Sequence, residues 1–124
     1  MPVELKESEI LDLIKKGESE TLEFKENLGE DVIVTSCAFA NTSGGIILVG
    51  VDRKGLVIGT QLGPESLNEW LNRMTNITEP RIMPDAGTVM VGGKTILVIG
   101  VKEHPFKPIS CRGAATGASV PATG

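Results

Sequence analysis

The chain has 124 residues and a formal net charge of −4, with 40% hydrophobic and 23% charged residues. This length suits one compact domain that buries roughly two-thirds of its unfolded surface, so a wholly disordered chain is excluded. The acidic balance excludes a protein that attracts phosphate backbones over its whole surface. Residues 1–31 carry ten acidic residues and four lysines, whereas residues 32–124 carry six acidic and eight basic residues. Any nucleic-acid surface must therefore be local.

Zinc sites, membrane spans and export signals find no support in the sequence. Cys37, Cys111 and the one histidine, His104, are too few for a four-ligand zinc site. No apolar run approaches the roughly 18 residues of a membrane span, and the first residues are acidic, unlike an export signal. With three Phe, one Trp and no Tyr, the chain lacks the aromatic platforms on which single-stranded bases usually stack. We expect a cytoplasmic protein that contacts no membrane and requires no cofactor.

Hydrophobic periodicity predicts a βαβ unit in the first half of the chain. A helix is predicted at about residues 7–16, followed by a half-buried strand over Glu20–Lys25. A second helix, at 30–42, opens with Glu30-Asp31. The aliphatic run Ile46–Val51 is typical of a central strand that is covered on both faces. Because a helix connects the two strands, we expect them to run parallel.

The second half predicts two hairpins and one more helix. The turn Asp52–Gly55 leads into a short strand at 56–58, which pairs most simply as a hairpin. A third helix starts at Pro64, and two strands, 88–91 and 95–101, flank a Gly-Gly turn. The predicted fold is a single domain of class α+β (mixed α/β), with about five strands and about three helices.

Three short motifs are better explained by structure than by chemistry. Gly93-Lys94-Thr95 resembles the end of a phosphate-binding loop, but the glycine spacing fails and a hairpin is favoured. His104 has no upstream nucleophile in a strand-to-helix turn, which argues against a hydrolase. The segment Asn41–Gly45 could cradle an anion, although helix ends commonly use Asn and Gly, and we favour that structural interpretation.

Charged residues near the predicted βαβ unit form the most informative cluster. Glu23 and Lys25 share the polar face of the first strand, and Asp52 directly follows the central strand. Parallel strands would bring Lys25 and Asp52 to the edge where open α/β sheets bind ligands. Glu18 converges with Glu23 only if the chain turns between Glu18 and Thr21. Such carboxylates could hold magnesium beside a phosphate, or they could simply be a solvated charged surface.

Four segments together resemble the Schlafen AlbA-like domain family, once labelled a divergent AAA domain and found in bacterial and archaeal transcriptional regulators. The resemblance rests on Gly17–Glu26, Cys37–Gly45, Ile47–Asp52 and Pro105–Pro108. It covers residues from about 5 to 112 and implies a mixed α/β or α+β fold with a nucleic-acid-binding role, often beside a winged-helix or helicase-related region.

The resemblance also implies a candidate catalytic set. Related domains in animal Schlafen proteins form an endoribonuclease with two Glu and one Asp, and the matching positions here are Glu18, Glu23 and Asp52. A nuclease of this kind would use Mg or Mn. The chain departs from the family pattern after Arg112, so we expect a domain at 1–112, a flexible tail at 113–124 and a missing domain end.

Three functional hypotheses remain open. The first is a DNA- or RNA-binding domain of a transcriptional regulator or helicase-related protein. The second is a Mg/Mn-dependent endoribonuclease that uses the carboxylates named above. The third is an interaction domain that forms a homodimer without nucleic acid. The residues expected to contact phosphates are Lys25, Arg53, Lys54, Lys107 and Arg112.

Overall fold

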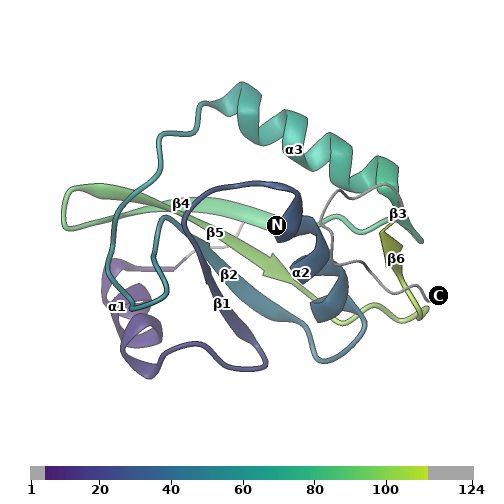
Figure 1. Cartoon of the computed structure of the whole chain (residues 1–124), viewed down its shortest axis with the longest axis horizontal. Coiled ribbons are helices and arrows are strands. Elements are labelled where there is room, and N and C mark those ends of the chain that lie inside the picture. The colour runs from purple at the N-terminus through teal and green to yellow at the C-terminus, as the bar shows by residue number, and fades with distance from the viewer. Residues whose placement is uncertain (1–4, 112–124) are drawn as a thin grey trace.

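The computed structural model describes residues 5–111, which form an α+β domain with two sheets (Figure 1). The larger sheet has four strands in the order β1-β2-β5-β4, and the smaller sheet pairs β3 with β6. Within residues 5–111, no helix is both long enough and apolar enough to cross a membrane. The elements in chain order are α1 (Glu7–Lys16), β1 (Leu22–Lys25), α2 (Glu30–Ala40), β2 (Gly45–Val49), α3 (Pro64–Ile77), β3 (Thr78–Glu79), β4 (Asp85–Val91), β5 (Lys94–Val101) and β6 (Ser110–Cys111).

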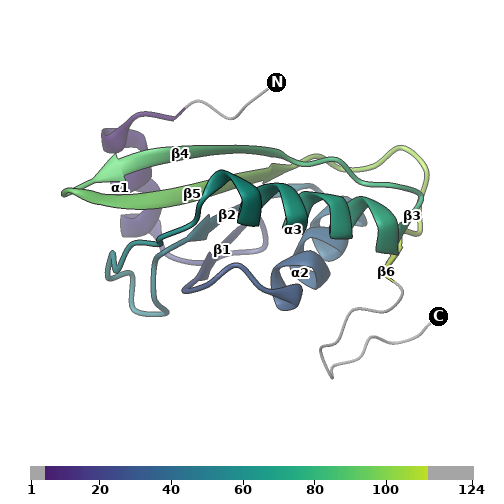
Figure 2. The same ribbon diagram turned by 90° about the horizontal axis from the view of Figure 1, so that it is seen from above.

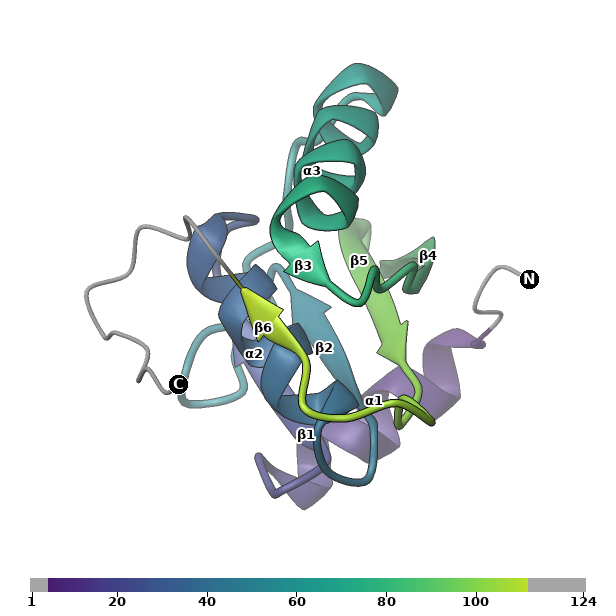
Figure 3. The same ribbon diagram turned by 90° about the vertical axis from the view of Figure 1, so that its right-hand side faces the viewer.

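Helices cover both faces of the four-stranded sheet. In the end-on view of Figure 3, the strands lie between α2 and α3 on one side and α1 on the other, and Figure 2 shows α3 running along the sheet. The side chains of β2 alternate between the two faces of the sheet. Ile47 and Val49 pack in the core with α2 and α3, whereas Leu48 packs in the core with α1. All three side chains are fully buried. The prediction of a central strand covered on both faces is therefore confirmed.

The predicted βαβ unit is also confirmed. Strands β1 and β2 are parallel, with Leu22 opposite Ile46 and Lys25 opposite Val49, and α2 connects them. Leu22 and Phe24 are buried on one face, as the alternation predicts. This arrangement places the segments that follow β1 and β2 at the same edge of the sheet.

The strand count differs from the prediction in two places. Residues 56–58 fold back as the expected hairpin, but only a single bridge, between Val51 and Val57, forms there instead of a strand of the sheet. Four strands therefore form the main sheet, not about five. The region after Pro105, which has no sequence pattern, contributes β6, whose two residues pair with β3. A two-residue strand carries no periodicity, so only contacts between distant parts of the chain define it.

A disulfide joins Cys37 in α2 to Cys111 in β6. The cysteine count excludes a zinc site but does not by itself predict this pairing across 74 positions. The side chain of Asn41 holds the same segment, since its Nδ2 donates to the Ile109 carbonyl and its Oδ1 accepts from the Ile109 N–H. The end of the described chain is therefore attached to α2 by a covalent bond and two hydrogen bonds.

Candidate functional site

A pocket of about 520 Å³ lies at the carboxyl ends of β1 and β2. Open α/β sheets commonly bind ligands at this edge, because loops from neighbouring strands leave the sheet together there. Four of the residues predicted from sequence are among those that line the pocket. The lining residues are Glu18, Glu23, Phe24, Lys25, Glu26, Val51 and Arg53.

Glu18 and Glu23 converge because the chain turns back between them. Ser19 and Leu22 form an antiparallel bridge, in which the Ser19 N–H donates to the Leu22 carbonyl at 2.9 Å. Glu18 Oε2 then accepts a hydrogen bond from the Phe24 N–H at 2.9 Å. This bond satisfies a donor on the open edge of β1, which would otherwise be free to pair with another strand. The turn on which the convergence depends is thus present.

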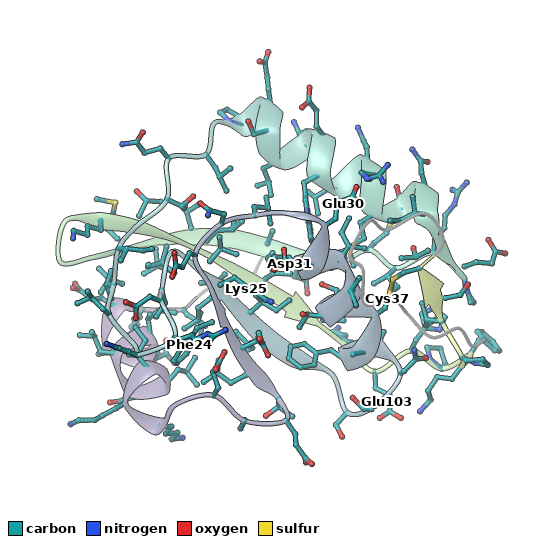
Figure 4. All side chains as sticks on the ribbon, viewed as in Figure 1. Phe24, Lys25, Glu30, Asp31, Cys37 and Glu103 are labelled. Carbon is teal, nitrogen blue, oxygen red and sulfur yellow. A yellow bond between two sulfur atoms is a disulfide. The ribbon has the colours of Figure 1, made fainter. Side chains whose placement is uncertain are left out.

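The two carboxylates and Lys25 form a coupled charge cluster. Partial burial raises the pKa of Glu23, and the nearby negative charge of Glu18 raises it further. Lys25 opposes this shift in the pKa of Glu23, since its Nζ lies 3.7 Å from Glu23 Oε2. The same Nζ lies 3.1 Å from Asp31 Oδ2 (Figure 4). The position of Asp31 in the sequence indicates only a helix start, and its contact with Lys25 depends on the fold. A phosphate that approaches Lys25 must compete with the carboxylates of Glu23 and Asp31.

Asp52 organises the hairpin that follows β2. Its Oδ1 accepts hydrogen bonds from the Lys54 and Leu56 N–H groups, both at 2.9 Å. Its own N–H donates to the Leu56 carbonyl at 3.0 Å. Val51 and Arg53 line the pocket, whereas Asp52, which lies between them, is absent from the lining. The carboxylate of Asp52 therefore holds the turn that carries Arg53 and Lys54.

The three carboxylates implied by the family resemblance do not form one metal-binding cluster. Within the described part of the chain, no group of three or more His, Cys, Asp or Glu side chains is arranged to hold a metal ion. Glu18 and Glu23 share the pocket, but Asp52 is bonded into its own turn. The expected three-carboxylate Mg or Mn set therefore does not fit this arrangement.

The predicted phosphate contacts fall into two separate groups. Lys25 and Arg53 lie at the pocket, and Lys54 is exposed in the same hairpin. Lys107 lies at the opposite end of the sheet, because β5 is antiparallel to β2 and Val101 is opposite Gly45. There it pairs with Glu103, which Figure 4 shows well away from Lys25. Arg112 lies outside the described residues.

The segment Asn41–Gly45 ends α2, as its Asn and Gly residues predict. The N–H of Gly44 donates to the Phe39 carbonyl at 2.8 Å, and Gly44 has a φ of 80°. This left-handed conformation is readily reached by glycine. A Cβ at Gly44 would lie 2.7 Å from the Val101 carbonyl oxygen, so the turn also needs glycine to pack against β5. Asn41 is bonded to Ile109.

Substitution of Asp52 separates a turn-forming role from a charge-dependent role. Asp52→Ala removes two hydrogen bonds, so we expect it to destabilise the protein by about 1–2 kcal/mol and to speed exchange of the Lys54 and Leu56 amides. Asp52→Asn keeps an oxygen acceptor and should stay close to wild type in both measurements. Urea unfolding and hydrogen exchange test this pair. Equal damage by both substitutions would show that the charge is required.

The fold and the pocket define a mixed α/β domain with a charged site at the ends of two parallel strands. Residues 18–118 match the family described as Schlafen, AlbA_2, and the chain belongs to this family. The resemblance inferred from sequence motifs is therefore confirmed. The comparison with curated proteins gave no match.

Solved structures with the same fold include the following two. The solution NMR structure of the N-terminal domain of a RecG-related protein from Nitrosomonas europaea has a TM-score of 0.72 at 24% identity, over 98% of this chain and 87% of that one. The crystal structure of the DIP2311 protein from Corynebacterium diphtheriae has a TM-score of 0.65 at 20% identity, over 86% of this chain. This chain spans 23% of the DIP2311 protein.

Proposed function

We propose that this chain is a nucleic-acid-binding domain and that Lys25, Arg53 and Lys54 contact phosphates. The observation that carries the proposal is the hairpin after β2, in which Asp52 fixes the turn and both Arg53 and Lys54 are exposed. Because the turn is fixed, binding does not have to order its backbone, and only the two side chains lose conformational freedom, which suits contacts that position a phosphate backbone. Binding of this kind requires no cofactor.

The proposed setting is a larger helicase-related protein or a transcriptional regulator. The name of the similar protein from Nitrosomonas europaea relates it to the ATP-dependent DNA helicase RecG. The DIP2311 protein is also much longer than this chain. In such a protein, this domain would hold DNA or RNA while other parts act on it.

The acidic charge of the chain makes the proposed binding local and sensitive to salt. Glu18, Glu23 and Glu26 share the pocket with Lys25 and Arg53, so a phosphate is repelled from the carboxylate side. The exposed cations of the hairpin offer the more favourable approach. Release of counterions from a few phosphates then supplies the affinity, which should fall steeply as the salt concentration rises.

Metal-dependent cleavage is the second candidate function. It is favoured by the approach of Glu18 and Glu23, since magnesium is often held by one or two carboxylates together with substrate phosphate. The bonding of Asp52 within its own turn counts against it. A binding domain should leave nucleic acid intact when metal is added, whereas a nuclease should cleave it, so one assay distinguishes the two functions.

The test incubates the protein with labelled tRNA, single-stranded DNA and duplex DNA, with and without Mg²⁺ or Mn²⁺, and scores retention and cleavage. The proposal predicts retention at low salt without metal and intact nucleic acid throughout. Cleavage only with metal would instead support the nuclease. Failure to retain any nucleic acid at low salt, together with a stable dimer, would support the interaction domain.

Removal of the Glu23 charge should strengthen binding at neutral pH. Because the pKa of Glu23 is raised, its protonation begins above the usual range for a Glu as the pH falls, and repulsion of phosphate then decreases. We expect Glu23→Gln to increase affinity at pH 7 by about two- to fivefold, the size of one exposed charge interaction. It should also flatten the rise in wild-type affinity that we expect as the pH is lowered toward the raised pKa of Glu23.

Glu20→Gln is the matched control, since Glu20 is exposed and does not line the pocket. It removes the same charge from a nearby position. Equal effects of the two substitutions on affinity and on its pH dependence would show that only net charge matters, which contradicts a specific role for Glu23. Titration of binding by fluorescence anisotropy at several pH values measures both.

A further inference from the structure

Among the Phe and Trp side chains within residues 5–111, only Phe106 is exposed to solvent. Its exposed fraction is 72%, whereas Phe24, Phe39 and Trp70 are 6–7% exposed. An exposed Phe ring does not stabilise either of the two cores in which the other three rings are packed. Composition alone does not show that one of the three Phe rings lies on the surface.

The loop that carries Phe106 is anchored to the domain at both ends. Before it, the His104 N–H donates to the Ala40 carbonyl at 2.8 Å. After it, Ile109 is buried and bonded to Asn41. Within the loop, the Phe106 N–H donates to His104 Nδ1 at 3.0 Å, and the centroids of the two rings lie 6.1 Å apart. The exposed ring is thus presented by a backbone with several fixed contacts.

A hollow of about 250 Å³ adjoins this loop. It combines apolar surface with groups able to donate or accept hydrogen bonds, which is the combination that a nucleobase requires on its faces and edges. Met83, at its rim, is 80% exposed. The lining residues are Ile82, Met83, Pro84, Asp85, Gly100, Lys102, Glu103, His104 and Pro105.

We propose that Phe106 and the adjoining hollow bind an unpaired base of single-stranded nucleic acid, with Lys102 and Lys107 near the neighbouring phosphates. The inference rests on the proposed nucleic-acid function and adds a second contact and a preference for single strands. Only an unpaired base can offer its face to Phe106, because the bases of a duplex are stacked on one another. Lys102 and Lys107 on the same loop favour a phosphate-bearing partner over an apolar protein surface, and a phosphate at Lys107 must displace the carboxylate of Glu103.

This second contact accounts for the separation of the predicted phosphate contacts into two groups. Lys25, Arg53 and Lys54 lie near the carboxyl end of β2, whereas Lys107 follows β5 at the other end of the sheet. The five residues of β2 span roughly 17 Å at the usual rise of a strand. An extended single strand can cover that distance and contact both ends of the domain.

The test compares Phe106→Leu and Phe106→Trp with wild type on an oligothymidylate of about 12 nucleotides, within the range that one small domain contacts. Phe106→Leu keeps an apolar side chain but loses the ring, so affinity should fall by about 5- to 100-fold. Affinity for a duplex of equal length should not change. Phe106→Trp should preserve affinity, and its indole fluorescence should be quenched when a base stacks on it. Trp70 is buried and adds a constant background.

Met90→Ala is the control, since Met90 is an exposed apolar residue on β4 outside both pockets. It should bind the single strand as wild type does.

Unchanged affinity of Phe106→Leu, or no quenching in Phe106→Trp, would overturn the inference while leaving the proposed function intact. Loss of a wild-type dimer in Phe106→Leu, with single-strand affinity unchanged, would identify the patch as a protein interface and also overturn it. If wild type retained no nucleic acid, the proposed function itself would fail.

Discussion

Replacing Cys111 by Ser is expected to lower the free energy of unfolding by about 2–4 kcal/mol under oxidising conditions. The disulfide with Cys37 closes a loop across 74 sequence positions, so its loss frees a large part of the unfolded chain. Cys111 is the better position to change, because Cys37 is buried in the core and its replacement would also disturb packing. Urea unfolding with and without a dithiol reductant measures the difference.

The reductant supplies the control for this prediction. Once the disulfide is reduced, wild type and Cys111→Ser should unfold at nearly the same urea concentration. Two titratable thiols in the oxidised wild-type protein, or equal stability of the two proteins without reductant, would contradict the bond. Structural disulfides are typical of oxidising compartments, so this pair does not favour the cytoplasmic location expected from the sequence.

Truncation of Trp70 is expected to cost about 3–5 kcal/mol, which is a large part of the stability of a domain of this size. Trp70 lies in the core that α2 and α3 share, and its Nε1–H donates to the Gly29 carbonyl at 2.9 Å. Gly29 directly precedes α2. Trp70→Ala therefore leaves a cavity between α3 and the sheet and also leaves a carbonyl without its donor.

Trp70→Phe separates these two contributions. It keeps most of the buried ring and removes the indole N–H, so we expect a smaller loss, of about 1–2 kcal/mol. Thermal unfolding and urea unfolding of both variants provide the comparison. A similar small loss in both variants would mean that α3 contributes little to the core, contrary to the near-complete burial of Trp70 and Met74.

The main sheet is predictable from sequence because its signals are local. The aliphatic run Ile46–Val51 includes every residue of β2 except Gly45, and the alternation in Glu20–Lys25 contains β1. The helical segment between them requires a crossover, which makes the strands parallel. By contrast, β3 and β6 have two residues each and depend on pairing between distant segments. The disulfide is also not predictable from local sequence, because the spacing of two cysteines along the chain does not determine their distance in the fold.

The candidate site is predictable in part. Glu18, Glu23, Lys25 and Arg53 line one pocket, and the parallel strands explain how residues far apart in sequence meet there. The orientation of Asp52 could not be read from its position, because an Asp after a strand can face a ligand or bond to the backbone two residues on. Here it bonds to the Lys54 and Leu56 N–H groups.

The most direct test of the proposed function is the salt dependence of duplex DNA binding by the double variant Arg53→Gln/Lys54→Gln. If both side chains contact phosphates, the slope of log affinity against log salt should become shallower by roughly two units, with little change in sequence preference. Lys15→Gln/Arg81→Gln is the control, because it removes two exposed charges from residues that do not line the pocket. It should keep the wild-type slope. An unchanged slope in the Arg53/Lys54 variant, or the same decrease in both variants, would contradict a phosphate-binding site on the hairpin after β2.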